Sequence, residues 1–224
     1  MTSELVLCFH GLGNPPSFIP SEEVPYWISV EKFTGILDQV SDLPSGSPKV
    51  ILTFDDGNVS DFNFALPLLS KRGLTATFFI VAGYVGKTSY LDTAMIKDLL
   101  DAGMKIGSQG MNHLNWRTLD EKSLATEVVV ARRKLEDMTQ GPITTVAIPF
   151  GSYDRRVLRQ LMIEPWECIY TTDRGLARRG ARIKPRETVD VHTPDQNFLR
   201  DVCSGAPLLT QVRRELSQCY KRLR

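Results

Sequence analysis

The chain has 224 residues, of which 42% are hydrophobic and 24% are charged, a composition typical of a soluble globular protein. This length is within the size of a single α/β barrel, so we expect one domain over residues 1–224. The formal net charge of +1 argues against a nucleic acid or an anionic membrane as the main partner.

Four cysteines are scattered along the chain without a C-x-x-C pair: Cys8, Cys168, Cys203 and Cys219. This spacing is not that of a disulfide scaffold or a thiolate zinc site, and it predicts free thiols in a reducing compartment. Residues 1–10 contain one short apolar run with no basic segment before it, which is not typical of a signal peptide. No stretch approaches the roughly 20 apolar residues that span a bilayer, so we expect a cytoplasmic location and no membrane span.

Apolar, β-branched runs alternate with segments of helical period from the first residues onward. The first half of the chain is predicted to form, in order, a strand at 5–9, a helix from a Ser29 cap to about 40, a strand at 50–54, a helix at 64–71, a strand at 76–81 and a helix from an Asp92 cap to 103. Pro67 must lie in the first turn of its helix or bend it.

The same alternation continues in the second half. It predicts a strand at 104–107, the longest helix from about 120 to 138, a strand at 145–148, a helix at 155–162, a strand at 168–171, a last strand at 188–191 and an amphipathic terminal helix at about 208–223. Strands that alternate with helices at this spacing predict right-handed βαβ units and a parallel sheet, either open or closed into a barrel.

Unusual polar residues follow several predicted strands at the point where each strand ends. They are His10, the run Asp55-Asp56-Gly57, the pair Ser108-Gln109 and the run Pro149-Phe150-Gly151. In a parallel barrel these strand ends meet on one face, where the catalytic loops lie, so this placement favours a barrel.

The adjacent carboxylates of Asp55 and Asp56 are the strongest chemical signal. Two acids at a strand end repel each other, and a divalent cation offsets that repulsion well. One acid can then bind the metal while the other acts as a base on water. The alternative is a solvated turn, since Asp-Asp-Gly is a good turn sequence.

A second polar loop, residues 106–113, runs from a predicted strand into glycines and a histidine. The spacing of Gln109 and His113 matches two ligands one helical turn apart. A histidine that stands alone in a loop is more often ordinary polar surface.

Together these segments resemble the NodB-homology polysaccharide deacetylases, the family 4 carbohydrate esterases. Thr-Phe-Asp-Asp-Gly at 53–57 is similar to their first motif, 109–113 falls on their His-(Ser/Thr)-x-x-His motif, and 147–151 falls on their Arg-Pro-Pro-(Tyr/Phe)-Gly motif. Phe9-His10 resembles the poly-N-acetylglucosamine deacetylase branch, which carries its general-acid histidine near the N-terminus.

The resemblance implies a deformed (β/α) barrel of about seven parallel strands, with the motif-bearing core at about 5–192. It also implies a metal-dependent hydrolase, acting on carbon–nitrogen bonds, that removes acetyl groups from an N-acetylated glycan or amino sugar. The roles it implies are Asp55 as general base, His10 as general acid, Asp56 and His113 as ligands of a divalent metal, with zinc favoured, and the backbone near Phe150 and Gly151 as an oxyanion site.

Two positions depart from this pattern. Gln109 stands where the family has its first metal-binding histidine, and an amide oxygen is a weaker zinc ligand than imidazole. Three interpretations stay open: weak metal binding with low activity, a pseudoenzyme that binds a glycan or a protein partner, or an introduced change. Ala147 replaces the third-motif arginine that orients the base in the family, and Arg186 is the candidate to substitute for it.

Other candidates compete for roles on the same rim. His192 is an alternative general acid, but His10 ends an apolar strand and is favoured. Candidate sugar-stacking aromatics are Tyr26-Trp27, Trp116, Tyr153 and Trp166, with Trp116 the best placed because it lies three residues after His113. Each is also compatible with core packing. A small-molecule amide hydrolase on the same barrel is a further hypothesis.

Overall fold

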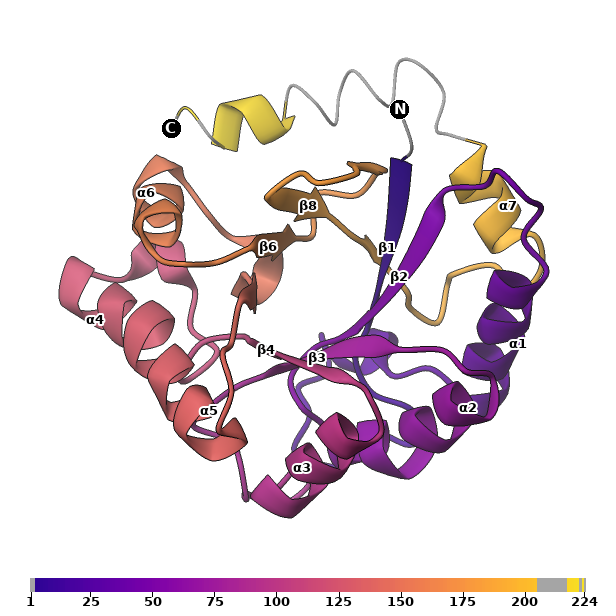
Figure 1. Cartoon of the computed structure of the whole chain (residues 1–224), viewed down its shortest axis with the longest axis horizontal. Coiled ribbons are helices and arrows are strands. Elements are labelled where there is room, and N and C mark those ends of the chain that lie inside the picture. The colour runs from indigo at the N-terminus through magenta and orange to yellow at the C-terminus, as the bar shows by residue number, and fades with distance from the viewer. Residues whose placement is uncertain (1–2, 205–216, 222, 224) are drawn as a thin grey trace.

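A computed structural model describes residues 3–204, 217–221 and 223. The strands form a nearly closed barrel with the helices on its outside (Figure 1), as the polar residues at the strand ends and the family resemblance predict. The strands are β1 Ser3–Phe9, β2 Lys49–Phe54, β3 Ala76–Ile80, β4 Lys105–Ser108, β5 Thr145–Ala147, β6 Cys168–Thr171, β7 Ala177–Arg178, β8 Ile183–Pro185 and β9 Glu187–Thr188.

The helices connect the strands and cover the outer face of the sheet. The α-helices are α1 Val30–Ser41, α2 Leu66–Lys71, α3 Thr93–Asp101, α4 Glu121–Ala125, α5 Ala131–Thr139, α6 Arg155–Ile163 and α7 Phe198–Cys203. Over residues 3–204 the structure also has three short 3₁₀ turns and two π-helical turns: η1 Val24–Tyr26, η3 Trp116–Thr118, η5 Pro149–Gly151, and the π-helical η2 Asp61–Ala65 and η4 Thr126–Val130. The expected caps are present, since the side chains of Ser29 and Asp92 accept from Lys32 N and Met95 N.

The sheet runs in the order β7-β1-β2-β3-β4-β5-β6-β8, and β9 pairs with β1. All neighbours are parallel except β7, which pairs antiparallel with the start of β1. Only Arg186 separates β8, which pairs with β6, from β9, which pairs with β1. These two pieces act as one broken strand that joins the sides of the sheet and nearly closes the barrel.

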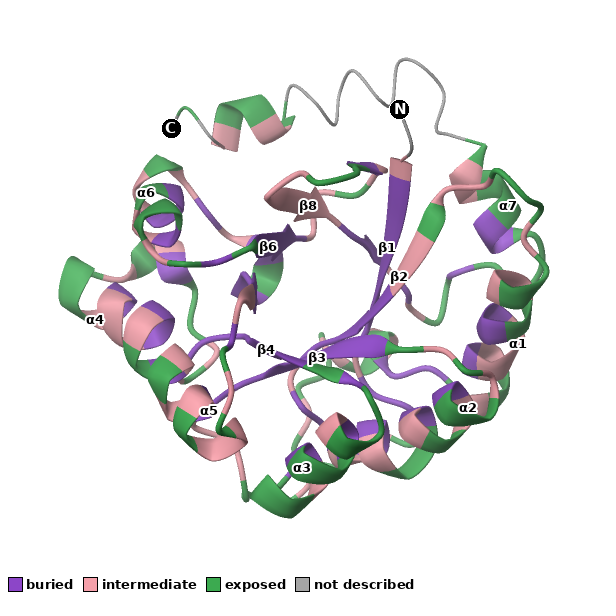
Figure 2. Cartoon of the chain, viewed as in Figure 1, coloured by how far each residue is buried: buried purple, intermediate pink, exposed green. Residues whose placement is uncertain are grey.

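Alternation along the strands separates two sets of side chains. Leu5, Leu7 and Phe9 of β1 belong to the large core between the sheet and the helices. Val6 belongs to a smaller core inside the barrel, with Phe79, Ala147, Cys168, Tyr170 and Ala177. Figure 2 shows most of the strands buried, apart from β8 and the start of β2, and the helices buried mainly on the faces turned toward the sheet. By the same alternation, residues 8 and 10 of the first segment and 53 and 55 of the second lie on the inner side.

The predicted last strand at 188–191 is wrong in its extent. The strand ends at Thr188, because Asp190 accepts from His192 N and Thr193 Oγ1 and so turns the chain. Of the predicted terminal helix at 208–223, residues 217–221 and 223 are helical and the rest lies outside the described residues. The four cysteines are free. None of the helices in the described part of the chain has the length and apolar character that a bilayer crossing requires.

Candidate active site

The carboxyl ends of the strands surround a cavity of about 530 Å³. Its position follows from the parallel sheet, since the loops after β1, β2, β3, β4, β5 and β6 all open onto this face. The lining includes eight residues singled out from the sequence: His10, Tyr26, Trp27, Asp55, Asp56, Gln109, His113 and Phe150. The sequence-based prediction of a shared rim is therefore confirmed for these side chains.

Asp55 forms a buried, bidentate ion pair with Arg186. The two guanidinium nitrogens donate to Asp55 Oδ1 at 2.6 Å and Oδ2 at 2.8 Å. Arg186 also donates to Thr53 Oγ1 and to the Thr171 carbonyl, so the side chain is fixed inside the barrel. Although burial alone would raise the pKa of Asp55, the Arg186 charge and hydrogen bonds hold that pKa below its ordinary value. Asp55 is thus an anion at neutral pH, held in one orientation.

Asp56 has an unusual backbone and an unsatisfied side chain. Its φ of 73° lies in the left-handed region that side chains other than glycine seldom adopt. Its Oδ1 is buried without a hydrogen-bond partner in the described part of the chain and lies 3.4 Å from His113 Nε2. Burial raises the pKa of Asp56 to about 6, although the nearby His10 acts in the opposite direction.

Gln109 connects Asp56 to His113 through its buried amide. Its Oε1 accepts from the Asp56 N–H at 2.6 Å, and its Nε2 lies 3.3 Å from His113 Nε2. Because the amide nitrogen can only donate, His113 Nε2 accepts in this arrangement and its proton lies on Nδ1. Burial lowers the pKa of His113, which favours this neutral imidazole.

A divalent metal fits this group only in part. Two ligands about 2.1 Å from a tetrahedral ion are about 3.4 Å apart, which is the separation of the free Asp56 Oδ1 from His113 Nε2. Gln109 turns its NH₂ group toward the same place, and its oxygen is already used by the Asp56 N–H. Asp56 and His113 are therefore suitable ligands, whereas the third position carries a group that cannot coordinate a cation.

His10 lies beside Asp55 on the inner side of the rim. The Cys8 sulfur, a ring nitrogen of His10 and a carboxylate oxygen of Asp55 all lie within 4.8 Å of one another. This is expected because Cys8 pairs with Thr53, and His10 and Asp55 lie two positions further along the same two segments. The His10 Nδ1 is buried without a hydrogen-bond partner among the described residues, and the ring lies 5.0 Å from that of Tyr26. His192, the competing candidate, is exposed and does not line the cavity.

The third motif places Phe150 at the mouth of the cavity. Its φ is 57°, its side chain is 57% exposed, and its ring lies 4.5 Å from the His113 ring. Gly151 N already donates to the Ile148 carbonyl, so it is not available as an oxyanion donor. Gly151 instead allows a close approach, because a Cβ there would lie 1.8 Å from Thr172 Oγ1.

The expectation that Trp116 offers a face to a sugar is wrong. Trp116 is fully buried, and Tyr153 and Trp166 are almost as inaccessible. Trp116 belongs to the support of the 109–113 loop, where its Nε1 donates to the buried carboxylate of Glu127. Glu127 also accepts from Met111 N and Asn112 N, and therefore fixes the backbone just before His113.

Several residues on the rim were not singled out from the sequence. The cavity is also lined by Phe18 and Glu23 from the loop after β1, Tyr84 and Tyr90 from the loop after β3, and Thr172, Arg174, Thr188 and Asp190 from the closing side. The rule that loops after parallel strands form the site applies to all of them. None of these residues belongs to the motifs that follow the strand ends directly.

Asp61 is a further buried acid near the site. It lies in η2, is fully buried, and neither carboxylate oxygen has a hydrogen-bond partner among the described residues. Burial raises the pKa of Asp61 well above its ordinary value, and the charges of Asp56 and Asp55 add to this effect. A neutral carboxylic acid is therefore the favoured form in the folded protein.

Comparison with known proteins identifies relatives of this fold and these motifs. The sequence profile of the family described as polysaccharide deacetylase matches residues 42–164. The chain is 27% identical over 130 residues to YxkH of Bacillus subtilis, provisionally named as a polysaccharide deacetylase, covering 58% of this chain and 47% of that one. It is 27% identical over 103 residues to the peptidoglycan-N-acetylglucosamine deacetylase of Bacillus cereus, covering 46% of each.

A solved structure, BC0361, a polysaccharide deacetylase from Bacillus cereus, is similar with a TM-score of 0.77 at 20% identity. The match covers 90% of this chain and 69% of that one, and it concerns the fold. The chain spans about half the length of the two curated relatives named above.

Proposed function

This chain belongs to the polysaccharide deacetylase family, and we propose that it is a hydrolase that releases the acetyl group from an N-acetylated amino sugar of a glycan. The observation that carries the proposal is the position of Asp55. It is an oriented anion that lines the cavity, with Arg186 on one side and His10 on the other.

The proposed base is Asp55. In hydrolysis of an amide, a carboxylate accepts a proton from the attacking water. Arg186 keeps Asp55 ionised and fixes both of its oxygens, so that the base is ready in one geometry. This arrangement supplies orientation, which is a large part of the advantage of an enzyme over solution.

The proposed acid is His10. An amine leaves an acyl centre only when it is protonated, and imidazole can hold or release a proton near neutral pH. His10 follows β1 and Asp55 follows β2, and these two strands are neighbours in the sheet. The buried Nδ1 of His10 has no hydrogen-bond partner among the described residues. The Phe150 backbone N–H is the proposed donor to the oxyanion, without help from Gly151.

Asp56 and His113 would hold a divalent metal, with zinc as the proposed ion, and Gln109 would weaken its binding. When bound, such an ion supplies Lewis-acid polarisation of the acetyl carbonyl. We further propose a reducing, cytoplasmic compartment, which the four free thiols favour.

The experiment measures acetate released from chito-oligosaccharides with zinc added, together with the metal content of the purified protein. Gln109→His is expected to raise both, with activity increased by at least about 10–100-fold because an imidazole ligand replaces the amide. Asp55→Asn in the same background is expected to abolish the release. If neither the parent protein nor the Gln109→His variant releases acetate and Asp55→Asn changes nothing, the enzymatic proposal is wrong.

A second candidate function is binding of a glycan without catalysis. The observation that favours it is the Gln109 amide, which already contacts both Asp56 N and His113 Nε2 without a cation. The same protein titrated with glycan separates the two candidates. Affinity that a chelator leaves unchanged, in a protein that releases no acetate, supports binding alone.

A further inference from the structure

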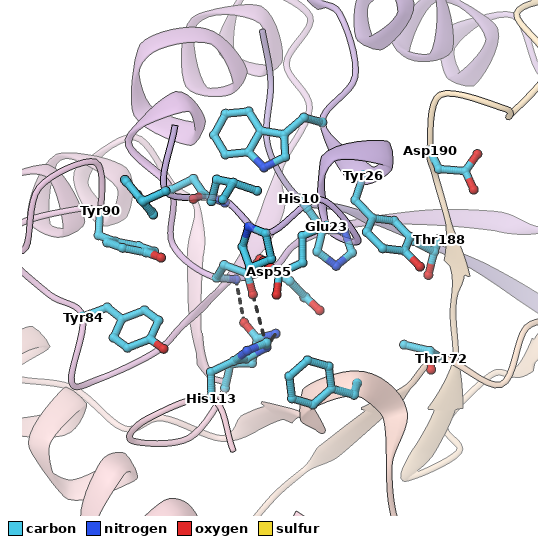
Figure 3. Close-up of a pocket in the computed structure, with 18 of the residues that line it drawn as sticks. His10, Glu23, Tyr26, Asp55, Tyr84, Tyr90, His113, Thr172, Thr188 and Asp190 are labelled. Carbon is cyan, nitrogen blue, oxygen red and sulfur yellow. Dashed lines mark hydrogen bonds and ion pairs between the residues drawn. The ribbon is translucent and has the colours of Figure 1, made fainter. Parts of the chain in front are cut away.

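A group of potential metal ligands that is separate from Asp56 and His113 lies where β1 and β2 end. It consists of the Cys8 sulfur, a ring nitrogen of His10 and a carboxylate oxygen of Asp55, which all lie within 4.8 Å of one another. This thiol group, as we call these three residues, shares no residue with the Asp56–His113 pair. In the view of Figure 3, Asp55 lies between the His10 ring and His113.

The register of two parallel strands produces the thiol group. Cys8 pairs with Thr53, and His10 and Asp55 each lie two positions further along the same two segments. Because side chains at i and i+2 share a face, Cys8 and His10 lie on the inner side of the barrel, as Thr53 and Asp55 do. The ligands are therefore carried by two paired strands and the residues that directly follow them. Such rigid elements hold the geometry of a metal site better than long loops do.

The members of the thiol group keep lone pairs that a cation can use. His10 Nδ1 is buried without a hydrogen-bond partner among the described residues. The Cys8 side chain is fully buried, and its contact to the Phe9 carbonyl is long, at 3.9 Å. Each Asp55 oxygen accepts one hydrogen bond from Arg186, which leaves a second lone pair on that oxygen. His10 and Asp55 line the cavity, so an ion can reach them from solvent.

The chemistry of these ligands selects a divalent ion that binds sulfur strongly. Thiolate, imidazole and carboxylate are all zinc ligands, and three protein ligands with one open position are usual where zinc contacts a substrate. Burial raises the pKa of the Cys8 thiol well above its ordinary value, so only an ion with a strong bond to sulfur displaces its proton. The Arg186 charge beside Asp55 repels any cation. It therefore disfavours magnesium and calcium, which prefer oxygen ligands and gain little from a thiolate.

We propose that Cys8, His10 and Asp55 form a second zinc site, and that zinc bound there inhibits the protein. Atoms that bind one tetrahedral zinc are about 3.4–3.7 Å apart, so each side chain has to move by no more than about 1 Å to reach the ion. An ion in this site occupies the carboxylate and the imidazole that serve as the proposed base and acid. Its effect on activity rests on the proposed function, whereas the binding of the ion is independent of it.

The test titrates the metal-free full chain with Co²⁺, which replaces zinc and shows a charge-transfer band in the near ultraviolet when a thiolate binds it. The parent protein is expected to develop this band, and Cys8→Ser is expected to lose it. His10→Ala is expected to weaken Co²⁺ binding at this band by at least about 10–100-fold. Cys168→Ser removes another buried thiol of the barrel interior that is outside the thiol group, and this matched control is expected to keep the band.

Absence of the band from the parent, or its survival in Cys8→Ser, would overturn the site. If Cys8→Ser unfolds at a lower temperature than the parent, His10→Ala decides instead, and unchanged Co²⁺ affinity in that variant contradicts the proposal. In the acetate assay, excess zinc is expected to inhibit the parent more strongly than Cys8→Ser, and equal inhibition of both contradicts the inhibitory role. A thiolate band in a protein that releases no acetate supports the zinc site and contradicts only the hydrolytic function.

Discussion

Arg186 illustrates how far single residues can be interpreted from the sequence. Arg186 was predicted to orient Asp55 because position 147 lacks the arginine of the family motif, and its guanidinium does bind the Asp55 carboxylate. The hydrogen-bond partners of Gln109 could not be predicted from the sequence. The left-handed backbone at Asp56 points the Asp56 N–H toward the Gln109 side chain, and that conformation is set by the fold. Trp116, Tyr153 and Trp166 were misassigned for the same reason, since their burial follows from the fold, whereas Tyr26 and Trp27 do line the cavity.

Asp61 provides a prediction at this scale. Its folded-state pKa is raised above the roughly 3.9 of an unfolded aspartate, so the folded state binds more protons. Stability therefore falls as pH rises from about 4 through the folded-state pKa. Asp61→Asn cannot ionise, so we expect it to be more stable than the parent at pH 8, by about 1–3 kcal/mol, and nearly equal near pH 4.

Urea unfolding at both pH values measures this difference. Asp98→Asn, an exposed position on α3, is the control and is expected to show no such trend. An advantage of Asp61→Asn that is larger at pH 4 than at pH 8 would contradict the assignment of a neutral, buried acid.

At the scale of elements, the strands and helices that alternate along the chain were predictable, including the short strands β4, β5 and β6, whereas β7 and β8 were not. Periodicity over five or more residues located β1, β2 and β3, and the helices α1 and α3 with their caps. The two residues of β7 and the three of β8 are too short to carry a period, so they were missed. The π-helical turns η2 and η4 were also invisible, because one widened turn leaves the apolar pattern of the helix almost unchanged.

The turn η4 matters because it carries Glu127, which fixes the loop of His113. Glu127→Gln keeps the size of the side chain but removes the charge that strengthens its bonds to Met111 N and Asn112 N. Hydrogen bonds to charged groups contribute about 1.5–3 kcal/mol, so we expect these two amides to exchange hydrogen about 10–100-fold faster.

Hydrogen exchange followed by NMR reports this change residue by residue. Glu121→Gln, at the start of α4 and exposed, serves as the comparison and should leave the exchange of residues 111 and 112 as it is in the parent. Unchanged protection in the Glu127 variant would show that the loop is held by other contacts.

At the scale of the whole molecule, the alternation of elements predicted a parallel sheet, and the polar residues at the strand ends favoured its closure into a barrel. The crowding of the barrel interior explains several glycines. Gly107 on β4 is one of them, since a Cβ there would lie 2.5 Å from the Phe79 ring. We expect Gly107→Ala to destabilise the protein by about 1–3 kcal/mol, because the barrel interior has no room for the added methyl group.

Gly35→Ala is the opposite case and the control. Nothing lies within 4 Å of a Cβ at that position on α1, so the same substitution is expected to stabilise the helix by about 0.5–1 kcal/mol. Chemical denaturation of both variants gives the two values. A Gly107→Ala protein as stable as the parent would mean that the strands can move apart.

The broken strand formed by β8 and β9 has a consequence for how the site comes into being. Synthesis delivers the N-terminal part of a chain first, and Arg186 follows Asp55 by 131 positions. Before Arg186 is synthesised, Asp55 has no counter-charge, and burial of its carboxylate is unfavourable. We therefore expect completion of the barrel and neutralisation of Asp55 to coincide in one late docking step, so that the candidate site forms last.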